Sequence, residues 1–209
     1  MTTMYAPIIE GPTLPFRYDV QAYHALLSTG VIEEGAPYEL LDGQIVRKLR
    51  NAMGEDPMTI GYEHVGCVQK LARLNGRLSK RGCHLRIQQP IAIPPFNVPE
   101  PDGAIVTGDV EFYISAKRHP EEREILCLIE VADASLSRDR GYKLRCYADA
   151  GVVMYVIVNL PERVAELYTE PVQGAGRYGR SVTLRGKEKL TLPTVEGSGV
   201  VVSVNSLLP

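Results

Sequence analysis

The 209-residue sequence has no closely spaced cysteines, no long apolar run and no strong net charge. Without a C-x-x-C pair a zinc site is not expected, and scattered cysteines in apolar contexts are typical of a reduced, cytoplasmic protein. The longest apolar stretch, Val152–Val158, is too short to span a bilayer. The N-terminus also lacks the basic-then-apolar pattern of a signal peptide. We therefore expect a cytoplasmic protein without a membrane partner, whose cysteines are Cys67, Cys83, Cys127 and Cys146.

The net charge is only −2 and the pI is about 6.1, so the chain as a whole has no field that would attract nucleic acid. Any nucleic-acid binding must come from local patches. The composition, with 44% hydrophobic and 23% charged residues, is that of a globular protein with a substantial core. The length suits one domain over residues 1–209, with a core at about 17–170 and a proline-bearing extended arm at 1–16.

Hydrophobic periodicity predicts alternating strands and helices. Asp19 is expected to cap a helix that runs to about Ser28, and Asp42-Gly43 lies between two strand-like stretches, a pattern typical of a β-hairpin. A long helix is predicted over 61–80 and a strand at about 85–93. The apolar runs 103–106, 124–131 and 152–158 predict buried strands, with a helix at 137–150 between the last two. That order implies a right-handed crossover between parallel strands.

Two carboxylates stand at the ends of buried strands, a position that acidic residues seldom occupy without a reason. Asp102 enters the strand at 103–106, and Glu130 nearly ends the strand at 125–131. Together with water and a substrate phosphate, two such carboxylates could hold a hard cation such as Mg²⁺, which would activate water for hydrolysis. The alternative, on these two positions alone, is a pair of acids that face solvent or helix ends.

Several short motifs follow one another in a specific order. They are Tyr38–Gly43 (YELLDG), Pro101-Asp102, Glu130–Leu136 (EVADASL), Asp139, Lys143, Tyr147, Ala150–Val152 and Tyr155–Val158. In order and spacing they resemble the Uma family of "putative restriction endonucleases", a branch of the PD-(D/E)XK nuclease superfamily, over about residues 17–170. The resemblance implies a restriction-endonuclease-like α/β fold with a central mixed sheet flanked by helices and a β-rich C-terminal part.

The resemblance also implies an active site made of Glu39, Asp102, Glu130 and Lys143. Asp102 and Glu130 would hold Mg²⁺ or Mn²⁺, Lys143 would orient or activate the attacking water, and Glu39 would assist. The lysine of the superfamily's E-x-K signature would fall at Ala132, which carries no charge. Lys143, on the next predicted helix, is the candidate replacement.

Three smaller patterns each have two interpretations. Asp139 and Lys143 are either a surface ion pair at helical spacing or a site lysine held in place by Asp139. His64 is either a surface residue near a helix start or a residue adjacent to the site, where the family often has a histidine. A basic stripe on the predicted helix is either a solvated face or a contact for DNA phosphates, and it consists of Lys70, Arg73, Arg77 and Lys80.

The leading hypothesis is a Mg²⁺-dependent DNA endonuclease that hydrolyses phosphodiester bonds and assembles as a homo-oligomer such as a homodimer. The alternative is a catalytically inactive protein that binds nucleic acid or another partner on the same fold. The presence of Asp102, Glu130 and Lys143 together favours the enzyme. The acidic pI and the missing lysine at position 132 favour the alternative.

Overall fold

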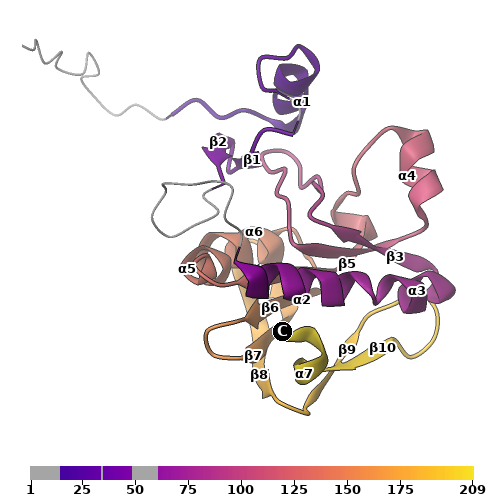
Figure 1. Cartoon of the computed structure of the whole chain (residues 1–209). Coiled ribbons are helices and arrows are strands. Elements are labelled where there is room, and N and C mark those ends of the chain that lie inside the picture. The colour runs from indigo at the N-terminus through magenta and orange to yellow at the C-terminus, as the bar shows by residue number, and fades with distance from the viewer. Residues whose placement is uncertain (1–14, 34, 49–60) are drawn as a thin grey trace, which may run out of the picture.

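The computed structural model describes residues 15–33, 35–48 and 61–209 (Figure 1). A six-stranded sheet with the order β3-β4-β5-β6-β7-β8 forms the centre. Strands β5 and β6 pair in parallel, and every other pair of neighbours in this sheet is antiparallel. The expected α/β fold with a mixed sheet is therefore confirmed, with strands β3 (Cys83–Ile87), β4 (Gly103–Thr107), β5 (Ile125–Ala132), β6 (Met154–Asn159), β7 (Val164–Val172) and β8 (Arg177–Arg185).

Each face of the sheet has its own core. On one face, α2 (Tyr62–Ala72) and α3 (Asn75–Leu78) pack on the sheet through Leu71 and Leu78. On the opposite face, α5 (Leu136–Arg138), the π-helical η3 (Asp139–Lys143) and α6 (Leu144–Asp149) form one continuous helical segment. Because β5 is covered on both faces, its sequence is almost entirely apolar, and Glu130 is the exception.

A small N-terminal unit lies beside this central sheet. Helix α1 (Val20–Ser28) begins where Asp19 accepts a hydrogen bond from the Ala22 amide at 2.7 Å, as the sequence predicts. The predicted hairpin of β1 (Tyr38–Leu41) and β2 (Gln44–Arg47) is also present. Its two turn residues, Asp42 and Gly43, have φ angles of 51° and 75°, as a two-residue turn between twisted strands requires. An isolated antiparallel bridge between Leu40 and Val98 joins β1 to the segment that precedes β4.

Two predicted elements are shorter than expected. The helix over 61–80 ends at Ala72, and a separate α3 and a 3-10 turn, η1 (Ser79–Arg81), follow before left-handed Gly82. The strand expected at 85–93 stops at Ile87, because Gln88 has a φ angle of 49° and turns the chain away from the sheet. Periodicity identified the apolar face of each segment but not the turn that divides it.

The remaining elements lie between β4 and β5 or at the C-terminal end. The sequence analysis missed the short helix α4 (Val110–Ala116), which Asp109 caps through a hydrogen bond from the Phe112 amide; η2 (Glu122–Glu124) follows it. The β-rich C-terminal part is present as predicted, with β9 (Lys189–Leu192) paired with β10 (Val200–Ser203) before α7 (Val204–Leu207). The expected arm at 1–16 lies almost wholly outside the described residues. No helix in the described part of the chain is long and apolar enough to cross a membrane.

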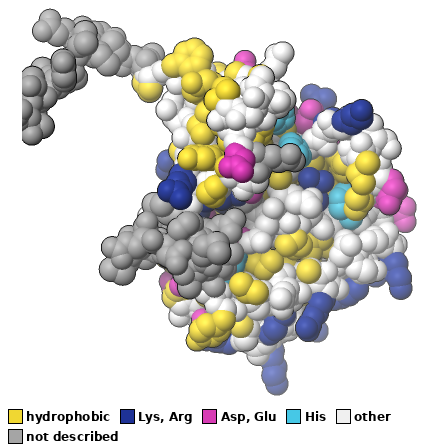
Figure 2. Space-filling view, turned by 45° about the horizontal axis from the view of Figure 1, so that its top comes forward, with side chains coloured by type: hydrophobic (Ala, Val, Ile, Leu, Met, Phe, Trp, Pro, Cys, Tyr) yellow, Lys and Arg dark blue, Asp and Glu magenta, His cyan; other side chains and the backbone are white. Residues whose placement is uncertain are grey.

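Two histidines join the N-terminal unit to the rest of the protein. His24 on α1 and His119, which follows α4, line one pocket, with ring centroids 5.8 Å apart in an edge-to-face arrangement. Figure 2 shows histidine side chains in the hollow between these two regions. Burial lowers the pKa of His24, and burial together with the nearby charges of Arg86 and His24 lowers the pKa of His119 to about 4. The contact is therefore made by neutral rings at neutral pH.

This contact should make stability depend on pH. Because the folded protein holds His119 with a lowered pKa, the stabilisation is complete above the unfolded pKa of about 6.5 and is lost as the pH falls toward 4. In His119→Phe, which keeps a ring but cannot titrate, the melting temperature should fall less than in wild type between pH 7 and pH 5. Thermal unfolding followed by circular dichroism measures this. Equal pH dependence in the two proteins would contradict a neutral contact.

Candidate active site

The pairing of β4 with β5 brings the two predicted metal carboxylates together. Gly103 pairs with Ile129 in an antiparallel register, so the next opposed positions are Asp102 and Glu130. Residues alternate in these strands, and Ala104 and Leu128 on the same face belong to the core that η3 and α6 cover. Glu130 therefore faces the helical segment that carries Lys143, while Asp102, just before β4, contacts His64 on α2.

Asp102 is held by three donors from three elements. Its Oδ2 accepts a hydrogen bond from the Val131 amide at 2.9 Å and lies 3.2 Å from Nε2 of His64 on α2, while Oδ1 accepts from Nε2 of Gln88 at 3.1 Å. Burial alone would raise the pKa of Asp102, but the hydrogen bonds from His64, Val131 and Gln88 outweigh it and lower that pKa. The carboxylate is therefore ionised at neutral pH, and His64 lies next to it.

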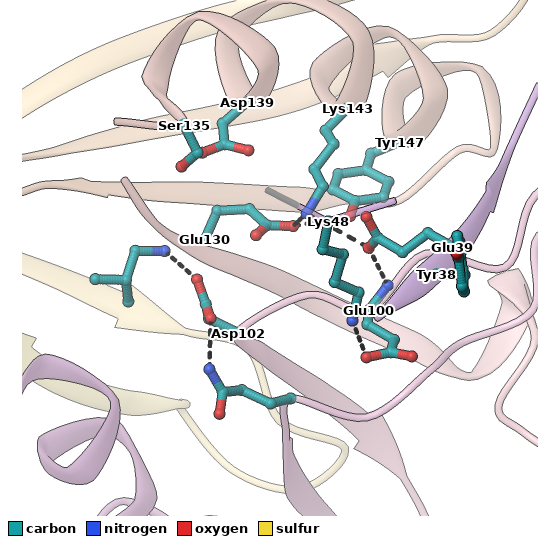
Figure 3. Close-up of polar contacts among 12 residues, drawn as sticks. Tyr38, Glu39, Lys48, Glu100, Asp102, Glu130, Ser135, Asp139, Lys143 and Tyr147 are labelled. Atoms are coloured by element: carbon teal, nitrogen blue, oxygen red, sulfur yellow. Dashed lines mark hydrogen bonds and ion pairs between the residues drawn. The ribbon is translucent and has the colours of Figure 1, made fainter. Parts of the chain in front are cut away.

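Lys143 points into the protein toward the carboxylates (Figure 3). Its Nζ donates to Oε1 of Glu130 at 2.8 Å and lies 3.9 Å from Oε1 of Glu39, and only 3% of its side chain is exposed. The hydroxyl of Tyr147, one turn further along the helix, also donates to Oε1 of Glu130 at 2.9 Å. Both contacts use the same carboxylate oxygen, so Oε2 of Glu130 has no hydrogen-bond partner within the described part of the chain.

The two charges of this buried pair respond differently to their surroundings. Burial raises the pKa of Glu130 to about 8, with Lys143 opposing the rise and the carboxylates of Asp139 and Asp102 adding to it. Burial would lower the pKa of Lys143, but Glu130, Glu39 and Asp139 outweigh it, so its pKa is raised and the ammonium keeps its proton. The cluster therefore contains more carboxylates than cations to neutralise them.

Glu39 reaches this cluster from the N-terminal unit. It is 1% exposed, and its Oε1 accepts a hydrogen bond from the Glu100 amide at 2.7 Å. Its Oε2 is buried without a hydrogen-bond partner in the structure. Lys48 forms an ion pair with the side chain of Glu100 beside it. A buried carboxylate oxygen without a donor is open to a cation or to a donor group of a ligand.

Asp139 does not hold the ammonium as expected. Among the described residues its carboxylate makes no ion pair with Lys143, and Oδ2 instead accepts from Oγ of Ser135 at 2.5 Å. The reason is local geometry: residues 139–143 form a π-helical turn, in which residues four apart no longer stack as they do in an α-helix. Both residues are buried, so the alternative of a surface ion pair is also excluded.

The basic stripe does not lie on one helical face, because the helix ends at Ala72. Two of its members contact backbone carbonyl groups near the C-terminal end: Lys70 donates to Leu208, and Arg77 donates to Val201 at 2.9 Å. Arg73 and Lys80 are exposed. Contact between this stripe and DNA phosphates stays a prediction.

Sequence analysis did not assign roles to Tyr147 or Gln88. Tyr147 lies four residues after Lys143, a spacing that places both on one side of a helix and could have indicated a shared contact. Gln88 follows a strand that ends earlier than predicted, so no pattern in the sequence places its amide at Asp102. The pairing of Lys48 with Glu100 likewise depends on tertiary structure.

The chain matches, over residues 20–205, the family model described as "Uma2: Putative restriction endonuclease". Among solved structures it matches a "putative nuclease belonging to DUF820" from Anabaena variabilis ATCC 29413, with a TM-score of 0.59 and 17% sequence identity. That match covers 86% of this chain and 94% of the other, and at this identity it is a likeness of fold. No curated protein matches the chain.

Removing the buried ammonium should destabilise the protein in a pH-dependent way. Lys143→Met leaves Glu130 and Glu39 without their cation and should lower the free energy of unfolding by about 3–5 kcal/mol. Lys143 lowers the pKa of Glu130, so its removal should raise that pKa above the wild-type value of about 8. The variant should then keep losing stability above pH 8, where wild type no longer does, and the loss relative to wild type should be larger at pH 9 than at pH 6. Urea unfolding measures both.

Two further variants define the outcome. Lys143→Met/Glu130→Gln removes the titrating carboxyl and should be more stable than the single variant at pH 9. The exposed Lys187→Met should leave stability unchanged at both pH values. Equal stability of the single and double variants at pH 9 would mean that an ionised Glu130 is not destabilising when Lys143 is absent.

Proposed function

The chain belongs to the Uma2 family, described as "putative restriction endonuclease", and from this premise we propose that it is a metal-dependent endonuclease that hydrolyses phosphodiester bonds in DNA. The observation that carries the proposal is the buried contact between Lys143 and Glu130, on the strand position opposite Asp102. This contact supplies the cation that Ala132 cannot supply at the E-x-K position. A PD-(D/E)XK-type site with its lysine on the helix is therefore the arrangement we propose.

Asp102 and Glu130 are the residues that we propose to hold Mg²⁺ or Mn²⁺. No group of three or more His, Cys, Asp or Glu side chains within residues 15–33, 35–48 and 61–209 is arranged to hold a metal ion. Mg²⁺ does not need such a group, because it is commonly held by one or two carboxylates together with water and a substrate phosphate. The buried, unpartnered Oε2 atom of Glu39 is an oxygen ligand of the kind that a hard cation takes. When bound, the ion would polarise the phosphate and acidify water.

The residues around the metal ligands have separate tasks in this proposal. Lys143 orients the attacking water and stabilises the negative charge that develops on the phosphate oxygens, because its ammonium is fixed before the substrate arrives. Tyr147 and Lys143 both fix Oε1 of Glu130, which leaves Oε2 for the cation. His64 fixes Asp102, and Glu39 shares the ammonium.

The alternative function is a catalytically inactive protein that binds DNA or another partner on the same fold. The uncharged Ala132 favours it, since the superfamily signature has lysine there. For the enzyme, and for an inactive protein that binds DNA, we propose Arg73 and Lys80 as phosphate contacts because their side chains are exposed. A homodimer is part of the same proposal. Metal binding and DNA cleavage separate the two functions.

Metal binding should depend on the two strand-end carboxylates. Calorimetry with Mn²⁺ should detect one site in wild type and none in Asp102→Asn/Glu130→Gln, because the main oxygen donors have lost their charge. Glu111→Gln removes one exposed carboxylate on α4 and should bind as wild type does. The same affinity in the double variant and in wild type would sink the proposed site.

DNA cleavage should require the ammonium as well as the carboxylates. With Mg²⁺ present, wild type should cut plasmid DNA, and Lys143→Met should cut it more slowly by about 10²–10³-fold, the typical effect of removing a group that stabilises transition-state charge. Lys187→Met should cut as wild type does. Gel analysis of the products gives the rates, with folding checked by circular dichroism. A wild-type protein that binds Mn²⁺ and DNA but cuts no plasmid would establish the inactive alternative.

A further inference from the structure

Among the residues that the structure describes, the cations in and beside the proposed active site are already neutralised by carboxylates, with one exception. Lys143 contacts Glu130 and Glu39, and Lys48 contacts Glu100. Arg140 contacts Glu166 at 2.7 Å and Glu162 at 3.3 Å. A DNA backbone carries a negative charge on every phosphate, and a free side-chain cation beside the proposed metal ion would favour its entry into a site rich in carboxylates. These three side chains cannot do so without leaving a buried or half-buried carboxylate unpaired.

Arg138 is the exception. It is the last residue of α5 and directly precedes Asp139. Its side chain is half-buried, and within the described part of the chain no carboxylate lies within ion-pair distance of it. Its Nε is buried and donates to no acceptor in residues 15–33, 35–48 and 61–209. A buried donor without an acceptor is costly and rare in folded proteins, so a guanidinium in this state indicates a binding partner from outside the chain.

The position of Arg138 places it beside the carboxylate cluster. It directly precedes Asp139, which is 1% exposed. Burial raises the pKa of the Asp139 carboxyl, and the nearby charges of Lys143 and Arg138 oppose that rise. Burial lowers the pKa of Lys143, and the surrounding carboxylates raise it by more. The positive charge of Arg138 lowers it again in part. The guanidinium is therefore electrostatically part of the site.

We propose that Arg138 binds a phosphate of the DNA backbone next to the scissile phosphodiester. This inference rests on the proposed function, since it names how the same site holds its substrate. A guanidinium presents its donors in a planar fork that matches two phosphate oxygens, and a phosphate that approaches from the site would provide the acceptor that Nε lacks. Arg138 is then a substrate-binding residue. Arg140, two residues later, is not, because its guanidinium already donates to the carboxylates of Glu166 and Glu162.

The experiment compares Arg138→Gln with Arg145→Gln. Arg145 lies on the same helical segment, is exposed and makes no ion pair among the described residues, so both variants lose one charge. Binding of a fluorescent 20-bp duplex is measured by anisotropy in EDTA from 50 to 200 mM salt. Arg138→Gln should weaken binding roughly tenfold and reduce the slope of log affinity against log salt by about 1, because one phosphate contact is lost. Arg145→Gln should change neither.

The substitution Arg138→Lys keeps the charge and the side-chain stem but loses the fork. It should keep the wild-type salt slope with weaker binding, and it tests the inference even if Arg138→Gln does not fold. If Arg138→Gln binds DNA as well as Arg145→Gln does, the role of Arg138 is overturned and the proposed function is not. If Arg138→Gln does not fold, wild-type affinity in Arg138→Lys has the same meaning. A wild-type protein that binds no DNA overturns both.

Discussion

The burial of one ammonium group determines how the rest of the site is arranged. A lysine nitrogen inside a protein is tolerated only when carboxylates surround it closely enough to replace water. Lys143 meets this condition through Glu130 on a central strand and Glu39 on a hairpin from the N-terminal unit. The main sheet, the crossover helix and the N-terminal unit must therefore all be in place before the charge is compensated. The site is a product of the whole fold rather than of one motif.

The same constraint explains why the carboxylates differ in character although they are neighbours. Asp102 lies at a strand end, where an amide, an amide side chain and an imidazole supply donors, and it is ionised. Glu130 lies one strand further into the sheet, where one ammonium and one phenol share a single oxygen. An excess of acidic groups around one lysine suits a site that takes up positive charge, and this is the physical basis for proposing a cation there.

Sequence patterns predicted what depends on local chemistry and on simple periodicity. The Asp42-Gly43 turn, the cap at Asp19 and the continuous apolar run of β5 follow from rules that concern a few adjacent residues. The convergence of Asp102, Glu130, Lys143 and Glu39 could be expected from the family resemblance, but not from spacing alone, because it depends on strand order. The break after Ala72 and the partner of Asp139 could not be expected, since tertiary contacts and one irregular turn decide them.

The irregular turn at 139–143 also matters for how such a site can change over time. A π-helical turn contains one residue more than the α-helical turn that it replaces. It therefore rotates the side chains before the turn about the helix axis, relative to those after it. Deleting one residue there would restore a regular helix and rotate the preceding residues by about 100° relative to Lys143 and Tyr147. Inserting or deleting a single residue in this turn therefore changes which side chains point into the site. The side chains that the helix presents to the site can change through such steps without any change in the sheet that carries the two strand-end carboxylates.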